Sequence, residues 1–115
     1  MSGPEQADCG AIVRVWHGWT DPADADAYEQ FLTDPENGLL ETLDGDGYLG
    51  YDLLQREADD EVEFVTQLRF AGYDAVREFA GEAYERAHVP DEARELLARW
   101  DDEAEHYELR AGNRV

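Results

Sequence analysis

The stretch AIVRVWHGW, residues Ala11–Trp19, decides how the rest of the chain is interpreted. Its β-branched and aromatic residues predict the first strand of a sheet. Side chains alternate between the two faces of a strand, which divides the stretch into two sets. One face carries Ala11, Val13, Val15, His17 and Trp19, and the other carries Ile12, Arg14 and Trp16. Both sets are largely apolar, so we expect both faces of this strand to be covered.

A helix and a pair of strands follow. Asp21 and Pro22 predict a helix start, with Asp21 as the capping residue. The segments Tyr48–Glu57 and Glu61–Phe70 read as strands, and the short polar loop between them predicts an antiparallel hairpin. On the second of these strands, one face carries Val62, Phe64, Thr66, Leu68 and Phe70.

The second half of the chain predicts two helical regions and a last strand. Apolar residues recur at helical spacing over Ala71–His88, with Gly81 as a candidate break. A third helix is expected over Pro90–Trp100, and Glu103–Arg110 is expected to form the last strand. Residues 1–10 are small and polar and predict a flexible tail ahead of one domain, residues 11–115.

The order β-α-β-β-α-(α)-β predicts an α+β, ferredoxin-like fold, with one antiparallel sheet and its helices on one face. The second face of such a sheet would expose Ile12, Trp16 and their neighbours to water. A second copy of the chain, stacked sheet against sheet, would cover them. We therefore expect an obligate homodimer.

Charge excludes several classes of partner. The chain has 115 residues, 29 of them acidic and only 9 basic, with a formal net charge of −20. Such a chain repels phosphate backbones and anionic membranes, which argues against nucleic acid and membrane as partners. The acids are dispersed and lysine is absent, a composition similar to that of proteins from salt-accumulating halophiles. Because salt screens self-repulsion, we expect stability to fall when salt is removed.

The single cysteine, Cys9, permits no internal disulfide and agrees with a reducing compartment. The sequence shows neither a signal peptide nor an apolar run long enough to span a bilayer. These features predict a soluble, cytoplasmic protein.

Several stretches, in this order and spacing, resemble the antibiotic biosynthesis monooxygenase (ABM) family of dimeric α/β barrels. The stretches are Val13–Thr20, Gly47–Gly50, Val62–Thr66, Asp74–Glu82, Val89-Pro90 and His106–Glu108. The resemblance implies a barrel-like homodimer with a pocket between helices and sheet. It also implies a small-molecule substrate, since the family includes cofactor-independent oxygenases that form quinones and enzymes that degrade haem.

On this resemblance, the leading hypothesis is a cofactor-independent monooxygenase that acts on a small aromatic or quinol-like compound. His17 and His88 are the candidate acid–base groups. The candidate substrate-binding residues are Trp16, Trp19, Phe64, Leu68, Phe79 and Tyr84. The alternative for all of these residues is an ordinary structural role, because aromatic residues at helical spacing commonly form core.

Two further functions stay open. A haem-binding or haem-degrading protein would use His88 as axial ligand, with Arg86 and Arg94 nearest in sequence to hold the propionates. A non-catalytic, ligand-binding dimer is the third hypothesis. No separate metal site is expected, because His17, His88 and His106 lack the paired spacing of a metal centre.

Overall fold

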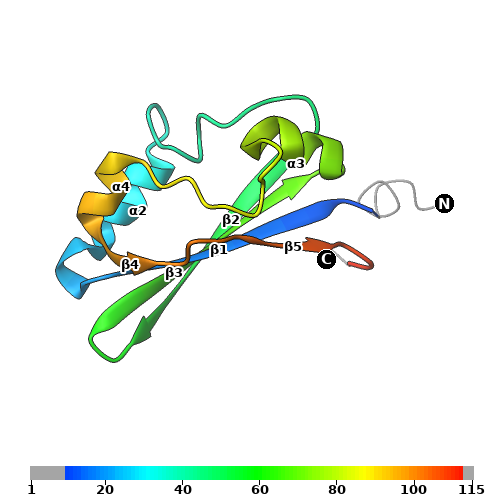
Figure 1. Ribbon diagram of the computed structural model, residues 1–115. Helices are drawn as coiled ribbons and strands as arrows, with labels where there is room; N and C mark the ends of the chain where they lie inside the picture. The colour runs from blue at the N-terminus through cyan, green and yellow to red at the C-terminus, as the bar shows by residue number, and fades with distance from the viewer. Residues whose placement is uncertain (1–9, 113–115) are drawn as a thin grey trace.

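The computed structural model of the chain describes residues 10–112 and shows an α+β architecture compatible with a ferredoxin-like fold (Figure 1). The elements are β1 (Ile12–Thr20), the 3-10 helix η1 (Pro22–Asp24), α2 (Ala25–Thr33), β2 (Tyr48–Ala58), β3 (Glu61–Phe70), α3 (Tyr73–Ala80), α4 (Asp91–Leu96), β4 (Leu97–Trp100) and β5 (Glu105–Glu108).

The five strands form one antiparallel sheet in the order β2-β3-β1-β4, with β5 also pairing with β1. β4 and β5 share one edge of β1: β4 lies beside Gly18–Thr20 and β5 beside Ile12–Val15. The antiparallel hairpin of β2 and β3 is confirmed, and its tight turn places Asp59 at a φ of +56°.

The helices cover the opposite face of the sheet from the one that we expected. Ile12 pairs with Phe70, and Gly18 pairs with Phe64. Residues opposite each other in a strand pair share a face, so Ile12, Arg14 and Trp16 lie with Phe64 and Leu68 against the helices. The prediction that Ile12 and Trp16 lie on the uncovered face is wrong. Pairing with β3 places both residues on the same side of the sheet as the buried side chains of β3, which is the side that the helices cover.

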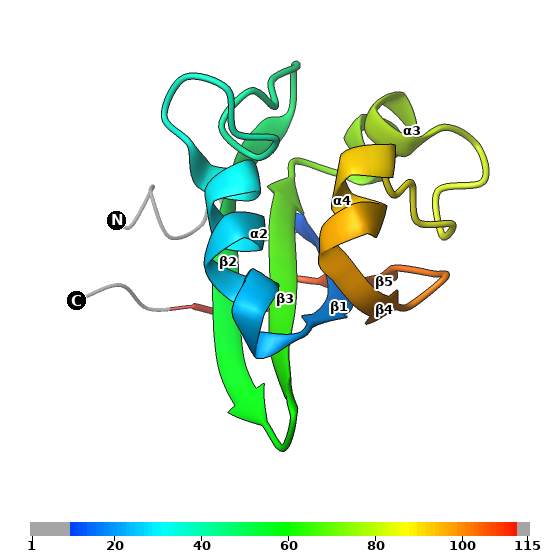
Figure 2. The same cartoon turned by 90° about the vertical axis from the view of Figure 1, so that its left-hand side faces the viewer.

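The core lies between this face and the helical layer. Tyr28 and Leu32 of α2, Val76 of α3 and Ala93 of α4 are all buried among the side chains of β1 and β3. Figure 2 shows α2 and α4 side by side in front of the sheet, and Figure 1 shows α3 on the same side of the sheet as these two helices.

No helix among the described elements covers the other face of the sheet (Figure 1). Val13, Val15, His17 and Trp19 of β1 lie on this face and are partly exposed. Leu54 of β2 is 47% exposed, and Tyr107 of β5 is 54% exposed. We call this surface the open face. It is the surface on which a second copy could pack.

The helical predictions need three corrections. Asp21 precedes η1 but makes no capping hydrogen bond through its side chain. The helical region predicted over 71–88 ends at Ala80, at the candidate break, where Gly81 takes a φ of +87°. His88 consequently lies in an irregular segment. The predicted third helix stops at Leu96, and Leu97–Trp100 pairs with β1 as a strand.

The predicted tail lies outside the described residues, apart from Gly10, and so does Cys9. The amide of Gly10 donates to the Leu109 carbonyl, extending the β1–β5 pairing. None of the helices within residues 10–112 is both long and apolar enough to cross a membrane.

Candidate functional site

A cavity of about 340 Å³ lies between the helical layer and the sheet. This is the position that the sequence resemblance implies for a pocket. Its walls are mainly aliphatic and aromatic, and they include Leu32, Leu39, Leu40, Leu43 and Leu68. A concave, mostly apolar space with a few polar groups is the usual form of a small-molecule site. The volume is at the lower end of the range for such sites and suits a ligand of one or two rings.

Four of the predicted site residues contact this cavity: Trp16, Leu68, Phe79 and His88. Trp16 reaches it from β1, and its indole Nε1–H donates to the Asp101 carbonyl at 2.7 Å. His88 is exposed at the rim, in the segment between α3 and α4. The cavity therefore has an apolar interior and an ionisable imidazole in contact with solvent.

Arg14 is the polar residue of the cavity that sequence reasoning missed. It lies on β1, lines the cavity and is only 7% exposed. Its Nη1 donates to the carbonyl of Tyr84, and its Nη2 donates to the carbonyl of Arg86 at 3.3 Å. Burial lowers the pKa of Arg14 from its usual value. The available signal was a charged residue inside a largely apolar strand, where a charge is rarely buried without a partner.

His106 is the third partner of Arg14 and must accept its hydrogen bond. Arg14 Nη1 lies 3.1 Å from Nε2 of His106, and a guanidinium has only donors. Nε2 of His106 is therefore unprotonated. Burial, followed by the nearby Arg14 charge, lowers the pKa of His106 below its usual value. Both effects favour the neutral imidazole beside the cation.

Phe64 and Tyr84 do not line the cavity. Phe64 is 1% exposed and belongs to the core, where its ring meets Tyr28 edge to face at 5.0 Å. Tyr84 lies in the segment after α3, and its ring packs against Tyr73 and His106. Both residues support the walls around the cavity and do not contact the space itself.

His17 and Trp19 lie on the open face and not in the helix–sheet cavity. The expectation that they line one pocket with Phe64 and Leu68 is wrong, because alternation along β1 places them on the other side of the sheet. Trp19 instead stacks beneath the Arg99 guanidinium, whose carbon lies 3.8 Å from the ring centroid.

An ionic cluster holds His17 on the open face. Nδ1 of His17 lies 2.8 Å from Oε2 of Glu63, and Nε of Arg56 donates to Oε1 of the same carboxylate at 2.6 Å. The bonds from His17 and then Arg56 lower the pKa of Glu63 from its usual value. Each oxygen of the Glu63 carboxylate thus accepts one hydrogen bond, and the cluster links β1, β2 and β3 on the open face.

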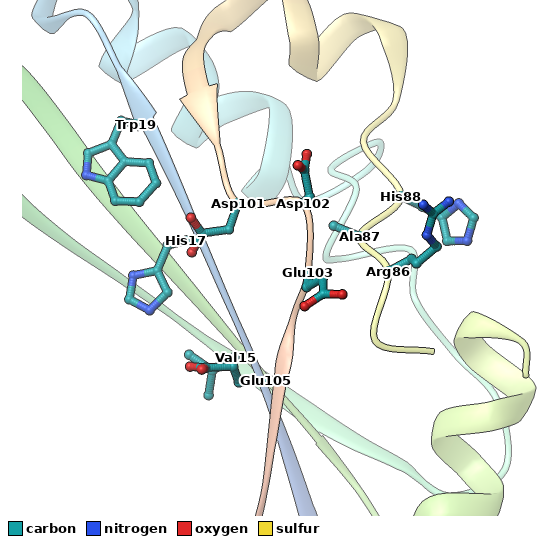
Figure 3. A pocket seen from close by; sticks show the side chains of 10 residues that line it. All are labelled: Val15, His17, Trp19, Arg86, Ala87, His88, Asp101, Asp102, Glu103 and Glu105. Atoms are coloured by element: carbon teal, nitrogen blue, oxygen red, sulfur yellow. The ribbon is translucent and has the colours of Figure 1, made fainter. Parts of the chain in front are cut away.

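A second, wide groove of about 1020 Å³ runs along the edge of β1 (Figure 3). His17 and Trp19 point to one side of β1, whereas Arg86 and His88 lie across the segment 101–105. Four acidic residues line it: Asp101, Asp102, Glu103 and Glu105. The groove is open and strongly acidic, which makes it a poor site for an apolar or anionic ligand.

Haem does not fit the residues around the helix–sheet cavity. His88 lies in an irregular, exposed segment and not at a helix end, and the cavity is small for a tetrapyrrole. Neither Arg86 nor Arg94 lines this cavity, and Arg94 Nε donates to the Val89 carbonyl. Among residues 10–112, no three His, Cys, Asp or Glu side chains gather as they would around a metal ion.

The sequence was compared with protein-family models, curated proteins and solved structures, and no significant match was found. The resemblance to the ABM family consequently rests on the stretches quoted from the sequence, and a shared fold alone does not assign a reaction.

Proposed function

We propose that the chain is an ABM-like, cofactor-independent monooxygenase that binds a small phenolic or quinol-like compound in the helix–sheet cavity. One observation carries this proposal: an apolar cavity of about 340 Å³, between sheet and helices, with the exposed His88 among the residues that line it. Apolar walls suit a flat aromatic ligand and exclude water from the reacting atoms.

The proposed reaction needs no reductant other than the substrate. A base removes the proton of the phenol, and the electron-rich ring then reduces O₂. A carbon–oxygen bond forms at the ring carbon para to the phenolate. The O–O bond then breaks, one oxygen atom stays on the ring and the other leaves as water. Phenol and O₂ thus give p-quinone and water, with all the electrons supplied by the ring.

His88 is the base in this scheme, because it is the one imidazole among residues 10–112 that contacts the cavity. Its exposed position lets it exchange the abstracted proton with solvent. The indole N–H of Trp16 already donates to the Asp101 carbonyl, so Trp16 serves as an aromatic wall.

Oxygen consumption with a panel of phenols and hydroquinones tests this function. We expect turnover in the native protein and at least a hundredfold loss in His88→Ala, the usual contribution of a general base. His17→Ala is the matched control, because His17 lies across the sheet from the cavity, and its turnover should stay within about twofold. Equal losses in both variants would refute the assignment of His88. A panel without any oxygen uptake would favour the non-catalytic, ligand-binding dimer.

We further propose that two copies pair through the open face to form the dimeric barrel. Leu54 and Tyr107 support this proposal, because both expose large apolar surfaces on the open face. Leu54 lies opposite Val65 of β3, and Tyr107 lies opposite Val13 of β1. Face-to-face packing of two sheets would bury them.

Sedimentation in concentrated KCl tests the dimer. We expect a particle of twice the 13.1 kDa chain mass, and dissociation in Leu54→Arg. Gln30→Arg, on the exposed side of α2, is the charge-matched control and should stay dimeric. A native protein that sediments as a stable monomer would refute the dimeric architecture.

A further inference from the structure

Arg14 is a buried cation without a counter-ion in the part of the chain that the structure describes. Its side chain makes no ion pair there, although the sequence contains 29 acidic residues. The other close contact of its charge is the ring of Phe79, 5.6 Å from the guanidinium carbon. Burying a charge without an opposite charge is costly, so such a residue calls for an explanation.

A count of donors shows that Arg14 has hydrogen-bonding capacity left. A guanidinium has five N–H donors. Nη1 uses its two on the Tyr84 carbonyl and on Nε2 of His106, and Nη2 uses one on the Arg86 carbonyl. The Nε–H and one Nη2–H therefore have no acceptor among residues 10–112. The three existing bonds go to neutral acceptors and leave the charge of Arg14 uncompensated.

The position of Arg14 makes an anion the natural complement. The residue lines the apolar cavity, so a ligand there would bring its polar group into the reach of the guanidinium. A carboxylate accepts two parallel N–H bonds from a guanidinium, and charge-assisted bonds of this kind are about twice as strong as neutral ones. The leucine-rich walls would hold the apolar part of the same molecule.

We propose that the helix–sheet cavity selects a small aromatic carboxylic acid, with Arg14 binding its carboxylate. This inference takes the cavity of the proposed function as the ligand site, and it names the class of molecule that the site admits. It does not depend on turnover. A neutral phenol of the same size should enter the cavity but lack the interaction with Arg14.

Calorimetric titration with three bicyclic probes tests the proposal. We use 1-naphthoate, 1-naphthol and 1-naphthylmethanol at pH 7 and at one KCl concentration, because chloride competes for a guanidinium. We expect 1-naphthoate to bind about tenfold more tightly than the two neutral probes, which corresponds to about 1.4 kcal/mol. Arg14→Gln should remove this preference, and Arg14→Lys should reduce it because an ammonium lacks the planar fork.

Arg86→Gln is the matched control. The side chain of Arg86 lies outside the cavity, so this variant should keep the preference for naphthoate. If the preference persists in Arg14→Gln, or is lost equally in Arg86→Gln, the proposal is overturned.

A second measurement separates anion binding from a purely structural role of Arg14 in holding the Tyr84 and Arg86 carbonyls. In ¹⁵N spectra of the native protein, the Nε–Hε resonance of Arg14 should move on addition of 1-naphthoate and stay still with 1-naphthylmethanol. This measurement remains available if Arg14→Gln does not fold. A resonance that ignores naphthoate overturns the proposal.

The outcomes also separate this inference from the proposed function. Equal binding of all three probes overturns the selection of an acid and leaves the cavity as a ligand site. Tightest binding of 1-naphthol overturns it in favour of a phenolic ligand. The absence of binding by all three overturns both the inference and the cavity on which the monooxygenase proposal depends. Naphthoate binding without oxygen uptake by any phenol supports the inference and contradicts the oxygenase.

Discussion

Replacement of Phe64 by alanine tests whether this residue belongs to the core or to a ligand site. Phe64 is 1% exposed and contacts Tyr28 edge to face, which joins β3 to α2. Removal of a buried phenylalanine ring costs about 3–5 kcal/mol, and aromatic pairing accounts for about 0.5–1.5 kcal/mol. Domains of this kind have a free energy of unfolding of about 5–15 kcal/mol, so the variant should lose a large fraction of its stability.

Phe79→Ala is the matched control, because it removes the same side chain at a position that is 41% exposed. We expect it to cost roughly half as much, in proportion to the buried area. Urea unfolding, followed by circular dichroism at constant KCl and protein concentration, measures both free energies. With a slope of about 2 kcal/mol per molar urea, Phe64→Ala should lower the midpoint by about 2 M. If the two variants have the same midpoint within about 0.5 M, Phe64 does not lie in the core.

Three further predictions concern a turn, a histidine and salt. Gly47 has a φ of +85°, and a Cβ there would lie 2.8 Å from that of Ala75, so Gly47→Ala should lose more than about 1 kcal/mol in urea unfolding. Gly72→Ala, with open space around the added atom, should lose far less. The lowered pKa of His106 means that the unfolded chain binds its proton more readily, so the stability from this residue is present above pH 6.5 and declines as pH falls below it. His106→Asn should flatten the dependence of the urea midpoint between pH 7.5 and 5.5, and an unchanged slope would contradict this. Finally, the melting temperature should fall between molar and millimolar KCl because unscreened acids repel each other, whereas a level melting temperature would argue against a halophilic character.

The local sequence pattern was sufficient to predict those elements whose structure depends on neighbouring residues in the chain. Alternating apolar residues predicted β1 and the β2–β3 hairpin to within about two residues, because a strand and a tight turn depend on local chemistry. The break at Gly81 was also visible in the sequence. The segment Leu97–Trp100 was not predictable in this way, because its helical spacing of apolar residues is outweighed by pairing with β1.

The site depended on contacts between distant residues. A cavity lies between sheet and helices, where the resemblance implies a pocket. Arg14 received no role from the sequence, since its burial depends on the carbonyls of Tyr84 and Arg86. Those two carbonyls lie 70 and 72 residues from Arg14 along the chain. No local pattern reports such a contact.

The sequence by itself determined that His17 and Trp19 share one side of β1 and that Ile12, Arg14 and Trp16 share the other. Only the tertiary structure decided which side faces the helices. Both sides of this strand are largely apolar, so the sequence pattern does not indicate which side is buried against the helices. Pairing of β1 with β3 decides it. That pairing places Ile12 opposite Phe70, and burial of the β3 side chains then assigns Arg14 to the cavity and His17 to the open face.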